Sequence, residues 1–290
     1  KEEFNLNPLL VTFSPMLPTE VGMHNREEIL KLGFDHYMIR PNQKVSRHLA
    51  RRFFIERGNP KVCWDAGINS IPVQVAVKLN IPLLFYAEHG ESEYGGKLLS
   101  EDHAKIRDIA EVLEHQIGDD PLNWVDDKVN EKNLASYVYP SIDIISKKNI
   151  KAMYFGYFFP WDIYKNYEYV TKRINFKTAP NGRTSGTFTN YDSLDDKIDS
   201  LYYYMQYIKF GFGRSVRDAS RLIMLGHISR SQGLDYVNKY DSEFPETYLP
   251  EVLDYLSLSK DELISIIDMH RNPEIWQKKD DKWKLMFDLI

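Results

Sequence analysis

Short apolar runs of strand length recur through the first half of the chain, each stopped by proline or by a polar turn. Pro8 to Pro15 is the first run, and residues 34–41 form a second in which apolar and more polar side chains alternate. Residues 81–86 and 152–159 follow the same pattern. Runs of this length predict strands, and nearly continuous apolar runs predict strands that are buried on both faces.

Segments with helical spacing of their apolar residues separate these runs. Residues 25–32 and 45–57 each end at a glycine, Gly33 and Gly58, where a left-handed backbone commonly closes a helix. Residues 72–80 have helical spacing and lead directly into the next strand. Because strands and helices alternate, we expect a parallel sheet. Further on, the pattern predicts an amphipathic helix at 100–118, a helical or irregular insertion at 122–139 and a short element at 140–145.

The last third of the chain predicts helices, including one from Asp162 to about Arg173 and one from Ser193 to Phe210. Two pairs have the spacing of capping boxes, in which a side chain and the backbone satisfy each other at a helix start. They are Ser229 with Gln232, and Ser259 with Glu262. The fold class that follows is α/β. We expect an α/β core in 1–175, with a helical insertion at about 98–150, and a mainly helical region in 176–290.

Charge and cysteine content exclude several classes of protein. The formal net charge of −5 gives no support to binding of nucleic acid through its phosphates. The single Cys63 excludes an internal disulfide framework and a zinc cluster built from cysteines. No apolar run reaches the roughly 18 residues of a membrane span, and there is no signal-peptide pattern. We therefore expect a cytoplasmic enzyme with no membrane span and no nucleic-acid partner.

The segment after residues 81–86 is the strongest candidate for chemistry. It reads Glu88-His-Gly-Glu-Ser-Glu-Tyr-Gly-Gly96, so a core strand breaks into glycines, a histidine and carboxylates. Ligands of open α/β sheets bind beyond the carboxyl ends of the strands. The loop imitates a phosphate-binding Walker loop but lacks its lysine and hydroxyl residue at the required positions. Two interpretations are therefore open: the loop binds a ligand or Mg²⁺, or it is a solvated acidic turn.

A second candidate segment is 181–199, in which Arg183 precedes a run of hydroxyl residues and glycine. Asp195 and Asp199 are spaced one helical turn apart, which would place them on one face. Acidic residues in the first turn of a helix complement its dipole without any ligand, and this explains Asp195 and Asp196 structurally. It does not explain Arg183 or Thr187, which favour a polar, tightly turning binding loop.

Two further features have simple structural explanations. Cys63 has no assignable base nearby in sequence, so a small buried hydrophobe is the favoured interpretation over a nucleophile. A basic helix face is more often solvated than functional, although an anionic substrate or partner could use it. Its residues are Lys44, Arg47, His48, Arg51 and Arg52.

Several segments, in the same order along nearly the whole chain, resemble the N-acetyl sugar amidotransferase family of bacterial surface-polysaccharide biosynthesis. Members of this family are PP-loop ATP pyrophosphatases with a Rossmann-like nucleotide-binding sheet. The segments that carry the resemblance are Pro8-Leu-Leu-Val-Thr-Phe, residues 81–96, Gly186-Thr-Phe-Thr-Asn-Tyr-Asp-Ser-Leu-Asp-Asp-Lys-Ile-Asp, Tyr207-Ile-Lys-Phe-Gly-Phe-Gly-Arg, Gly226-His-Ile-Ser-Arg and Lys239-Tyr-Asp-Ser-Glu-Phe-Pro.

The chain departs from the family pattern at its start. The family opens with a CxxC-type zinc-binding segment and a Ser-Gly-Gly-x-Asp-Ser phosphate loop, and neither is present here. The chain begins at Lys1 with a sequence that reads like the end of a helix running into a strand. We therefore expect the first strand, the phosphate loop, the first helix and any zinc segment to lie upstream. Without them, the chain would be a relative that lacks ATP chemistry.

The resemblance implies conversion of a sugar acetamido group to an acetamidino group by ATP, Mg²⁺ and ammonia, through an adenylated intermediate. It implies a free or nucleotide-linked N-acetylated sugar as substrate, and glutaminase and cyclase-like subunits as the source of ammonia. By position, Thr12, Phe13 and Ser14 would meet the adenosine. Glu88, His89, Gly90 and Glu91 would lie beside the phosphates, with Glu88 and Glu91 on Mg²⁺.

The resemblance also assigns residues to the sugar or the adenylate: Arg183, Thr187 and Asp199 would bind substrate, and Glu88, Asp195, Asp196 and Lys197 would be catalytic. Two alternatives remain open. One is another PP-loop reaction such as tRNA thiolation, against which the acidic balance and the missing cysteine pair count. The other is a binding subunit without the phosphate loop.

Overall fold

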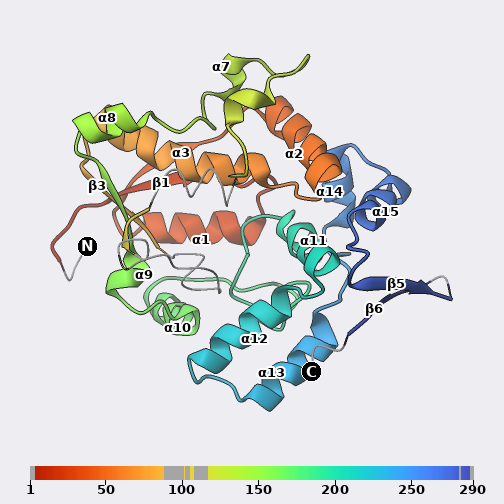
Figure 1. The fold of residues 1–290 in the computed structure, drawn as a ribbon. Coiled ribbons are helices and arrows are strands. Elements are labelled where there is room, and N and C mark those ends of the chain that lie inside the picture. The colour runs from red at the N-terminus through yellow and green to blue at the C-terminus, as the bar shows by residue number, and fades with distance from the viewer. Residues whose placement is uncertain (1–3, 88–100, 102–104, 108–116, 281, 288–290) are drawn as a thin grey trace. The chain divides into compact units, whose positions relative to one another are not determined.

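The computed structural model describes residues 4–87, 101, 105–107, 117–280 and 282–287. The chain divides into two compact units (Figure 1). The first comprises Lys1–Pro15, Glu27–Leu49 and Lys61–Ile163, and the second comprises Met16–Arg26, Ala50–Pro60 and Tyr164–Ile290. The helices α1 (Glu20–Leu30) and α2 (Gln43–Arg57) each contribute residues to both units.

The first unit contains two parallel strand pairs. β1 (Leu9–Phe13) pairs with β2 (Asp35–Ile39), and β3 (Leu83–Tyr86) pairs with β4 (Lys151–Tyr154). The prediction of parallel strands at these four places is confirmed. The strand expected at 152–159 ends early, because Phe155–Phe158 form one helical turn, α9. Shorter elements of this unit are η2 (Pro121–Trp124), α7 (Glu131–Leu134) and α8 (Ile142–Lys147).

Helix α3 (Val62–Leu79) supports the strands of the first unit and packs on both β1 and β3. The prediction that a helix starts at Pro72 was wrong by ten residues, since Pro72 lies inside α3. Proline costs a helix interior about 3 kcal/mol, but α3 is buried along much of its length, so packing outweighs the local preference. Cys63 is one of its buried residues, as expected for a small hydrophobe.

The predicted helix at 100–118 is contradicted near its middle, where Ile106 forms an antiparallel bridge with Met153 of β4. The amide of Arg107 also donates to the carbonyl of Ala152, at 3.0 Å. At this point the backbone pairs with the edge of β4 and not with its own preceding turn, so the segment is extended here. The remaining predicted helix residues mostly lie outside the described part of the chain.

The second unit is mainly helical, as predicted for the last third of the chain. Both capping boxes are confirmed, with Ser229 and Ser259 each accepting from the amide three residues on and receiving the reciprocal bond. Its helices are α10 (Ile163–Arg173), α11 (Asp199–Phe210), α12 (Arg214–Met224), α13 (Arg230–Tyr240), α14 (Leu249–Leu256) and α15 (Lys260–Met269). The core of this unit is built from Ile198, Leu201, Met205, Ile208, Leu256 and Leu263.

Two features of the second unit differ from the sequence prediction. The helix expected from Ser193 begins only at Asp199, so Asp195 and Asp196 precede it and do not share a helical face with Asp199. The chain also ends in an antiparallel hairpin that was not predicted, formed by β5 (Trp276–Lys279) and β6 (Lys282–Leu285). The indole of Trp276 anchors this hairpin by donating to the carbonyl of Ile208 at 2.8 Å. Among the described residues, no helix combines the length and apolarity needed to cross a bilayer.

Candidate functional site

The segment before α11 is held by Asp196, which is 4% exposed. Its carboxylate accepts hydrogen bonds from the amides of Met16 (2.7 Å) and Leu17 (3.0 Å). The amide of Lys197 in turn donates to the carbonyl of Leu17, at 2.9 Å. This pairing of two extended segments, distant in sequence, explains why the helix does not start earlier. It also fixes the backbone on both sides of Lys197.

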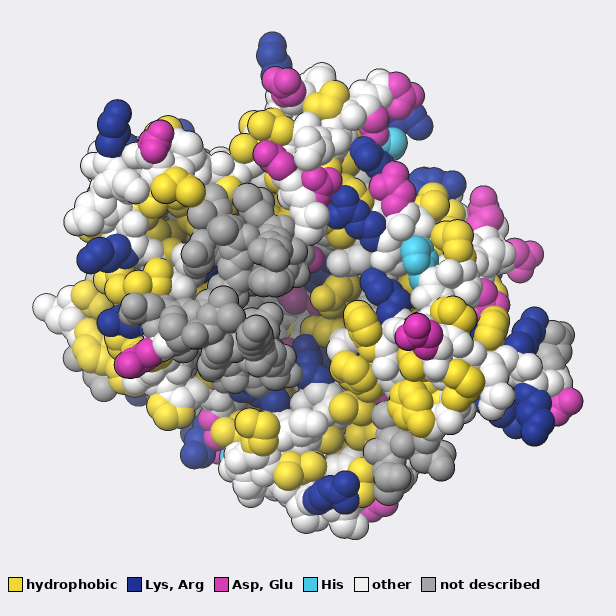
Figure 2. Space-filling model, in the orientation of Figure 1, with side chains coloured by type: hydrophobic (Ala, Val, Ile, Leu, Met, Phe, Trp, Pro, Cys, Tyr) yellow, Lys and Arg dark blue, Asp and Glu magenta, His cyan; other side chains and the backbone are white. Residues whose placement is uncertain are grey.

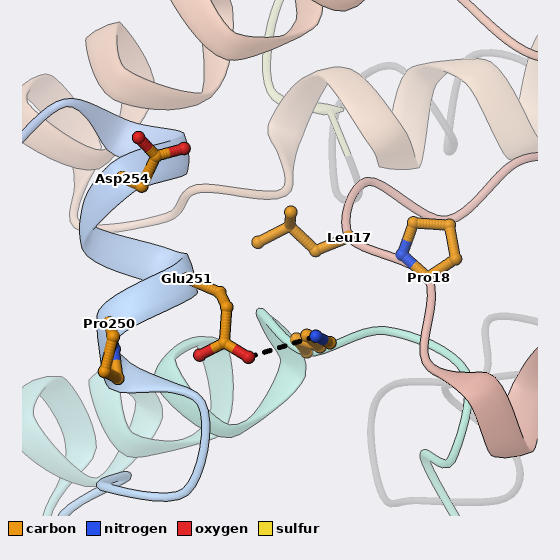
Figure 3. A pocket seen from close by; sticks show the side chains of 6 residues that line it. Leu17, Pro18, Pro250, Glu251 and Asp254 are labelled. Atoms are coloured by element: carbon orange, nitrogen blue, oxygen red, sulfur yellow. Dashed lines mark hydrogen bonds and ion pairs between the residues drawn. The ribbon is translucent and has the colours of Figure 1, made fainter.

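A pocket of about 430 Å³ opens beside this pairing, within the second unit (Figure 3). Leu17, Pro18 and Pro250 form apolar walls, and Glu251 and Asp254 present carboxylates. The side chain of Lys197 completes the lining and pairs with Glu251 at 3.1 Å, the dashed contact in Figure 3. The pocket therefore combines an apolar wall with hydrogen-bonding groups of both signs, as a polar organic ligand requires.

Lys197 also lies over the ring of Tyr248, with its Nζ 5.3 Å from the ring centre. The pKa of Glu251 is held below its usual value, first by a bond from its own backbone amide and then by Lys197. Both side chains are partly exposed. A partly exposed ion pair is worth little stability, so a ligand can replace either partner at low energetic cost.

The predicted binding loop around Arg183 is organised by a two-pronged ion pair. Nη1 and Nη2 of Arg183 donate to the two carboxylate oxygens of Glu243, at 2.6 and 2.7 Å. The amide of Gly186 donates to the same carboxylate at 2.8 Å, and the guanidinium stacks over Tyr240 at 4.5 Å. Bonds from Arg183 and Gly186 hold the pKa of Glu243 below its usual value. In this arrangement Arg183 fixes the shape of its own loop.

Thr187 is fully buried and donates from its hydroxyl to Asp218 of α12, at 2.6 Å. Thr189 donates to the same carboxylate oxygen at 3.2 Å. The other oxygen of Asp218 accepts from Arg217, whose guanidinium also reaches Asp192 at 2.5 Å. The loop and α12 are thus joined by a network of charged and hydroxyl groups.

A second arginine of α12 extends this network inward. Arg214 is 1% exposed, donates to the carbonyl of Asp192 at 2.9 Å, and lies 4.9 Å from the ring centre of Tyr203. Burial opposes ionisation of Asp192, yet the charges of Arg217 and Arg214 hold its pKa below the usual value. Two arginines therefore favour the ionised form of this partly exposed carboxylate.

The start of α12 is held by the carboxylate of Asp241, at the C-terminal end of α13. Asp241 accepts from the amides of Gly213 (2.6 Å) and Val216 (3.0 Å), two of the free donors at the helix start. Burial raises the pKa of Asp241, and the amide bonds only partly oppose that effect. Asp241 thereby orients the helix that carries both arginines of the network.

The residues predicted to meet adenosine lie at the carboxyl end of β1, in the first unit. The Thr12 hydroxyl is within 2.9 Å of Nε2 of His36, Phe13 is buried, and the Ser14 hydroxyl donates to the carbonyl of Pro15. The hydroxyls of Thr12 and Ser14 already have hydrogen-bonding partners. An adenosine at this position would therefore contact the end of the strand and would not find a free hydroxyl. The position fits the strand-end rule for nucleotides.

Glu88, His89, Gly90 and Glu91, the residues predicted for phosphate and Mg²⁺, lie outside the described part of the chain. Within the described ranges, no group of three or more His, Cys, Asp or Glu side chains is arranged to hold a metal ion. Asp199 is buried at the first position of α11, where it suits the helix dipole. The proposed roles of these residues therefore stay predictions.

Sequence reasoning missed the partners that organise the predicted loop: Asp192, Asp218, Glu243, Arg214, Arg217 and Asp241. One signal could have found part of this set. Arg214, Arg217 and Asp218 repeat at intervals of three and four residues, which places charge along one face of a helix. Asp192 lies within the predicted segment 181–199 but was not singled out there, and Glu243, in another segment, carries no local signal.

The strand pairs and helical region define a mixed α/β protein with short parallel sheets and a helical C-terminal part. Comparison with known families matches residues 185–289 to a profile described as "LPS biosynthesis protein WbpG-like, C-terminal domain". The matched segment includes Thr187, the pocket residue Lys197 and the whole of α12. Over these residues the chain is similar to a family of lipopolysaccharide biosynthesis. No curated protein matches the chain significantly.

Proposed function

We propose that this protein is an ATP-dependent amidotransferase of bacterial lipopolysaccharide biosynthesis, which converts the acetamido group of a sugar to an acetamidino group. One observation carries the proposal: residues 185–289 match the lipopolysaccharide family in the segment where the resemblance to N-acetyl sugar amidotransferases is densest. The parallel pairs β1–β2 and β3–β4 support a Rossmann-like nucleotide-binding sheet in the first unit. We place the protein in the cytoplasm, where its ATP is available.

The reaction needs activation because an amide carbonyl is a poor electrophile toward ammonia. Transfer of AMP from ATP to the acetamido oxygen releases pyrophosphate and converts that oxygen into a leaving group. Ammonia adds to the carbon, AMP departs with the oxygen, and the amidine takes up a proton. Glutaminase and cyclase-like subunits are proposed to supply the ammonia. Bound Mg²⁺ would offset phosphate charge in such a site.

We assign the sugar to the pocket that contains Lys197, because its walls suit a molecule with both apolar and polar faces. Leu17 and Pro18 offer contact for an acetamido methyl group, and Glu251 and Asp254 can accept from sugar hydroxyls. Lys197 can donate to the acetamido oxygen once it is released from Glu251, 3.1 Å away. Asp196 has a positioning role, since its carboxylate holds the backbone beside Lys197.

The reaction class is tested with the complete polypeptide, ATP, Mg²⁺ and ammonium at alkaline pH, against a panel of free and nucleotide-linked N-acetylated sugars. We expect a product lighter by the difference between oxygen and NH, together with stoichiometric AMP and pyrophosphate. Absence of this mass change with every sugar would refute the reaction. AMP release that depends on tRNA would favour thiolation, and sugar binding without AMP release would favour a binding subunit.

The assignment of the sugar is tested by Lys197→Met with Lys260→Met as the matched control. Lys260 also pairs with a glutamate, Glu246 at 3.4 Å, but lies outside the pocket lining. Loss of one charge-assisted hydrogen bond of about 1.5–3 kcal/mol predicts a KM for the sugar raised by roughly tenfold to a hundredfold. The control should leave KM unchanged. An unaltered KM in Lys197→Met removes the pocket from the proposal and leaves the reaction class standing.

A further inference from the structure

The hairpin β5–β6 of the second unit has two unlike faces. Side chains alternate along a strand, and residues directly opposite each other in an antiparallel pair share a face. The observed register therefore sorts the strand residues into two groups of four. One group is Trp276, Lys278, Trp283 and Leu285, and the other, which we call the lysine face, is Gln277, Lys279, Lys282 and Lys284.

The face that contains both tryptophans is packed against the rest of the second unit. Trp276 is buried, and its ring meets that of Tyr207 in α11 edge-on, with centroids 5.2 Å apart. The guanidinium of Arg271 lies 4.6 Å from the ring centre of Trp276 and 5.0 Å from that of Trp283. These contacts fix the orientation of the hairpin, so the lysine face is turned outward.

The lysine face has no counter-charge of its own. Its three lysines are exposed and form no ion pair with any described residue. Lys279 lies directly opposite Lys282, and like charges in that position destabilise a strand pair. Residues 276–285 contain four lysines and two aspartates, hence a net charge of +2, within a chain whose net charge is −5. Lysine on an exposed strand also discourages pairing between edges, so a second feature is needed to identify a binding surface.

That second feature is an apolar patch at the base of the hairpin. Gly211 ends α11 with a left-handed backbone (φ 78°), and a Cβ at this position would lie 2.9 Å from the ring of Phe287. The rings of Phe210 and Phe212, on either side of Gly211, stack with centroids 6.1 Å apart. The exposed members of the apolar patch are Phe210, Phe212, Met286 and Phe287, which are 39% to 55% exposed.

The apolar patch continues the lysine face. The amide of Met286 donates to the carbonyl of Ile275 at 2.9 Å, so the pairing of the hairpin extends one residue beyond β6. Met286 therefore follows Lys282 and Lys284 at alternate positions on the outward face. Figure 2 shows hydrophobic side chains gathered at the base of the hairpin and Lys or Arg side chains toward its tip.

We propose that the lysine face and the apolar patch together bind the surface of an anionic lipid bilayer. The apolar side chains would enter the headgroup region, and the lysines would place their ammonium groups beside lipid phosphates with their alkyl chains along the interface. Contact through a few side chains of each kind gives peripheral, reversible binding that weakens with salt. This inference goes beyond the proposed reaction and does not depend on it.

The types of residue favour a bilayer over a protein partner. Protein interfaces are enriched in arginine and depleted in lysine, whereas every cation of the lysine face is lysine. A lysine ammonium is a hydrated point charge on a flexible chain, which suits a diffuse layer of phosphates better than one fixed carboxylate. Phenylalanine and methionine side chains offer no hydrogen bond to a specific partner, and a bilayer interior requires none.

Sedimentation of the complete polypeptide with vesicles tests the proposal. Vesicles of phosphatidylglycerol and phosphatidylcholine in equal parts are compared with vesicles of phosphatidylcholine alone, at low and at high salt. We expect binding to the anionic vesicles only, and release at high salt because the attraction of the lysines is screened. Each lysine near an anionic surface changes the affinity by about fivefold, so Lys279→Gln, Lys282→Gln and Lys284→Gln together should weaken binding by roughly a hundredfold.

Two matched controls separate the surface from charge and hydrophobicity in general. Three exposed lysines elsewhere, replaced by glutamine together, remove the same charge and should leave binding unchanged: Lys132, Lys147 and Lys172. For the apolar patch, Met286→Ser should weaken binding by roughly fivefold. Met224→Ser is its control, since Met224 is more exposed still (79%) but belongs to α12, outside the apolar patch.

Several results would overturn the proposal. Equal binding by the two triple variants, or equal binding to both kinds of vesicle, would show that the lysine face does not recognise anionic lipid. Absence of vesicle binding, with aggregation of the Lys279/Lys282/Lys284 variant, would show that these lysines only prevent pairing between edges. Tighter binding to a single-stranded oligonucleotide than to anionic vesicles would assign the surface to nucleic acid. Self-association that Met286→Ser abolishes, without vesicle binding, would assign it to a second copy of the chain.

Discussion

At the scale of single residues, Asp196 shows how a side chain that looks catalytic in a sequence can be engaged with backbone amides in the structure. Its two oxygens accept from Met16, Leu17 and the amide of Ile198. Replacing it would therefore disturb the pocket by releasing the strand-like pairing beside Lys197. Activity lost in an Asp196 variant needs a stability measurement beside it before any catalytic role is inferred.

We expect Asp196→Ala to lower the free energy of unfolding by about 3 kcal/mol, because buried amide donors at Met16 and Leu17 lose their acceptor. Asp196→Asn keeps one acceptor oxygen and should cost roughly half as much. Urea unfolding at neutral pH measures both, and the m-value should stay constant. An alanine variant as stable as the parent would show that water replaces the carboxylate without loss.

Arg183 and Thr187 carried enough signal to be singled out from sequence, but not enough to reveal which residues they contact. Their residue types suggested binding, and the structure engages Arg183 with Glu243 and Thr187 with Asp218. These partners are 60 and 31 residues away along the chain. Local patterns contain no information on pairing over such separations, so a polar loop held by the protein looks the same as one waiting for a ligand.

At the scale of elements, the strands β1, β2 and β3 and most helices of the second unit were predictable because one physical rule dominates each. Apolar runs set the strands, and the Ser259 capping box set the start of α15. The failures occur where two rules compete. Burial of α3 overrode the proline signal at Pro72, and a pairing with Leu17 and Pro18 delayed the start of α11.

The hairpin β5–β6 was missed because its strands are short and carry four lysines. A weak signal was present in the alternation of Trp283 and Leu285 with lysines, next to a turn where Asp280 has a left-handed backbone (φ 52°). Its stability depends on the indole of Trp276, which reaches Ile208 in α11. Tertiary anchoring of this kind is absent from any local pattern.

The contact of α3 with β1 predicts the sign of a glycine substitution. A Cβ at Gly67 would lie 2.3 Å from a ring carbon of Phe13. Helix propensity alone predicts that Gly67→Ala stabilises by about 1 kcal/mol, but overpacking of this degree costs typically 1–3 kcal/mol. We expect net destabilisation by about 1–2 kcal/mol in thermal or urea unfolding. In a Phe13→Leu background the penalty should shrink, and a stabilised Gly67→Ala protein would show that α3 can move away from β1.

At the scale of the whole molecule, the parallel strand pairs and the helical C-terminal part were predictable, whereas the placement of charge was not. The net charge of −5 gives no hint that specific donors hold the pKa of a few carboxylates below its usual value. Those with a lowered pKa include Asp126, beside His48 in the first unit, and Asp192 and Glu243 in the second. The pKa of Asp241 is shifted in the opposite direction, because burial raises it.

These shifts determine how stability depends on pH. A carboxylate whose pKa is lower in the folded than in the unfolded state stabilises the fold at neutral pH, and this contribution disappears as pH falls through the folded-state pKa. Asp241 has the reverse sign, since its contribution is present in acid and disappears as pH rises through its raised pKa. Because the lowered groups outnumber it, we expect stability to fall steadily below about pH 5.

Glu243→Gln isolates one contribution to this acid loss. The amide cannot ionise, so the part of the acid loss that arises from the pair with Arg183 should vanish. The variant should be less stable at neutral pH and should approach the parent in acid, as pH falls through the lowered pKa of the parent's Glu243. Urea unfolding at intervals between neutral and acid pH measures the difference. Glu246→Gln is the matched control, since its partner Lys260 is an exposed lysine at 3.4 Å, and it should follow the parent throughout. Two parallel curves for Glu243→Gln and the parent would mean that Arg183 stabilises the loop equally well without the charge on its partner.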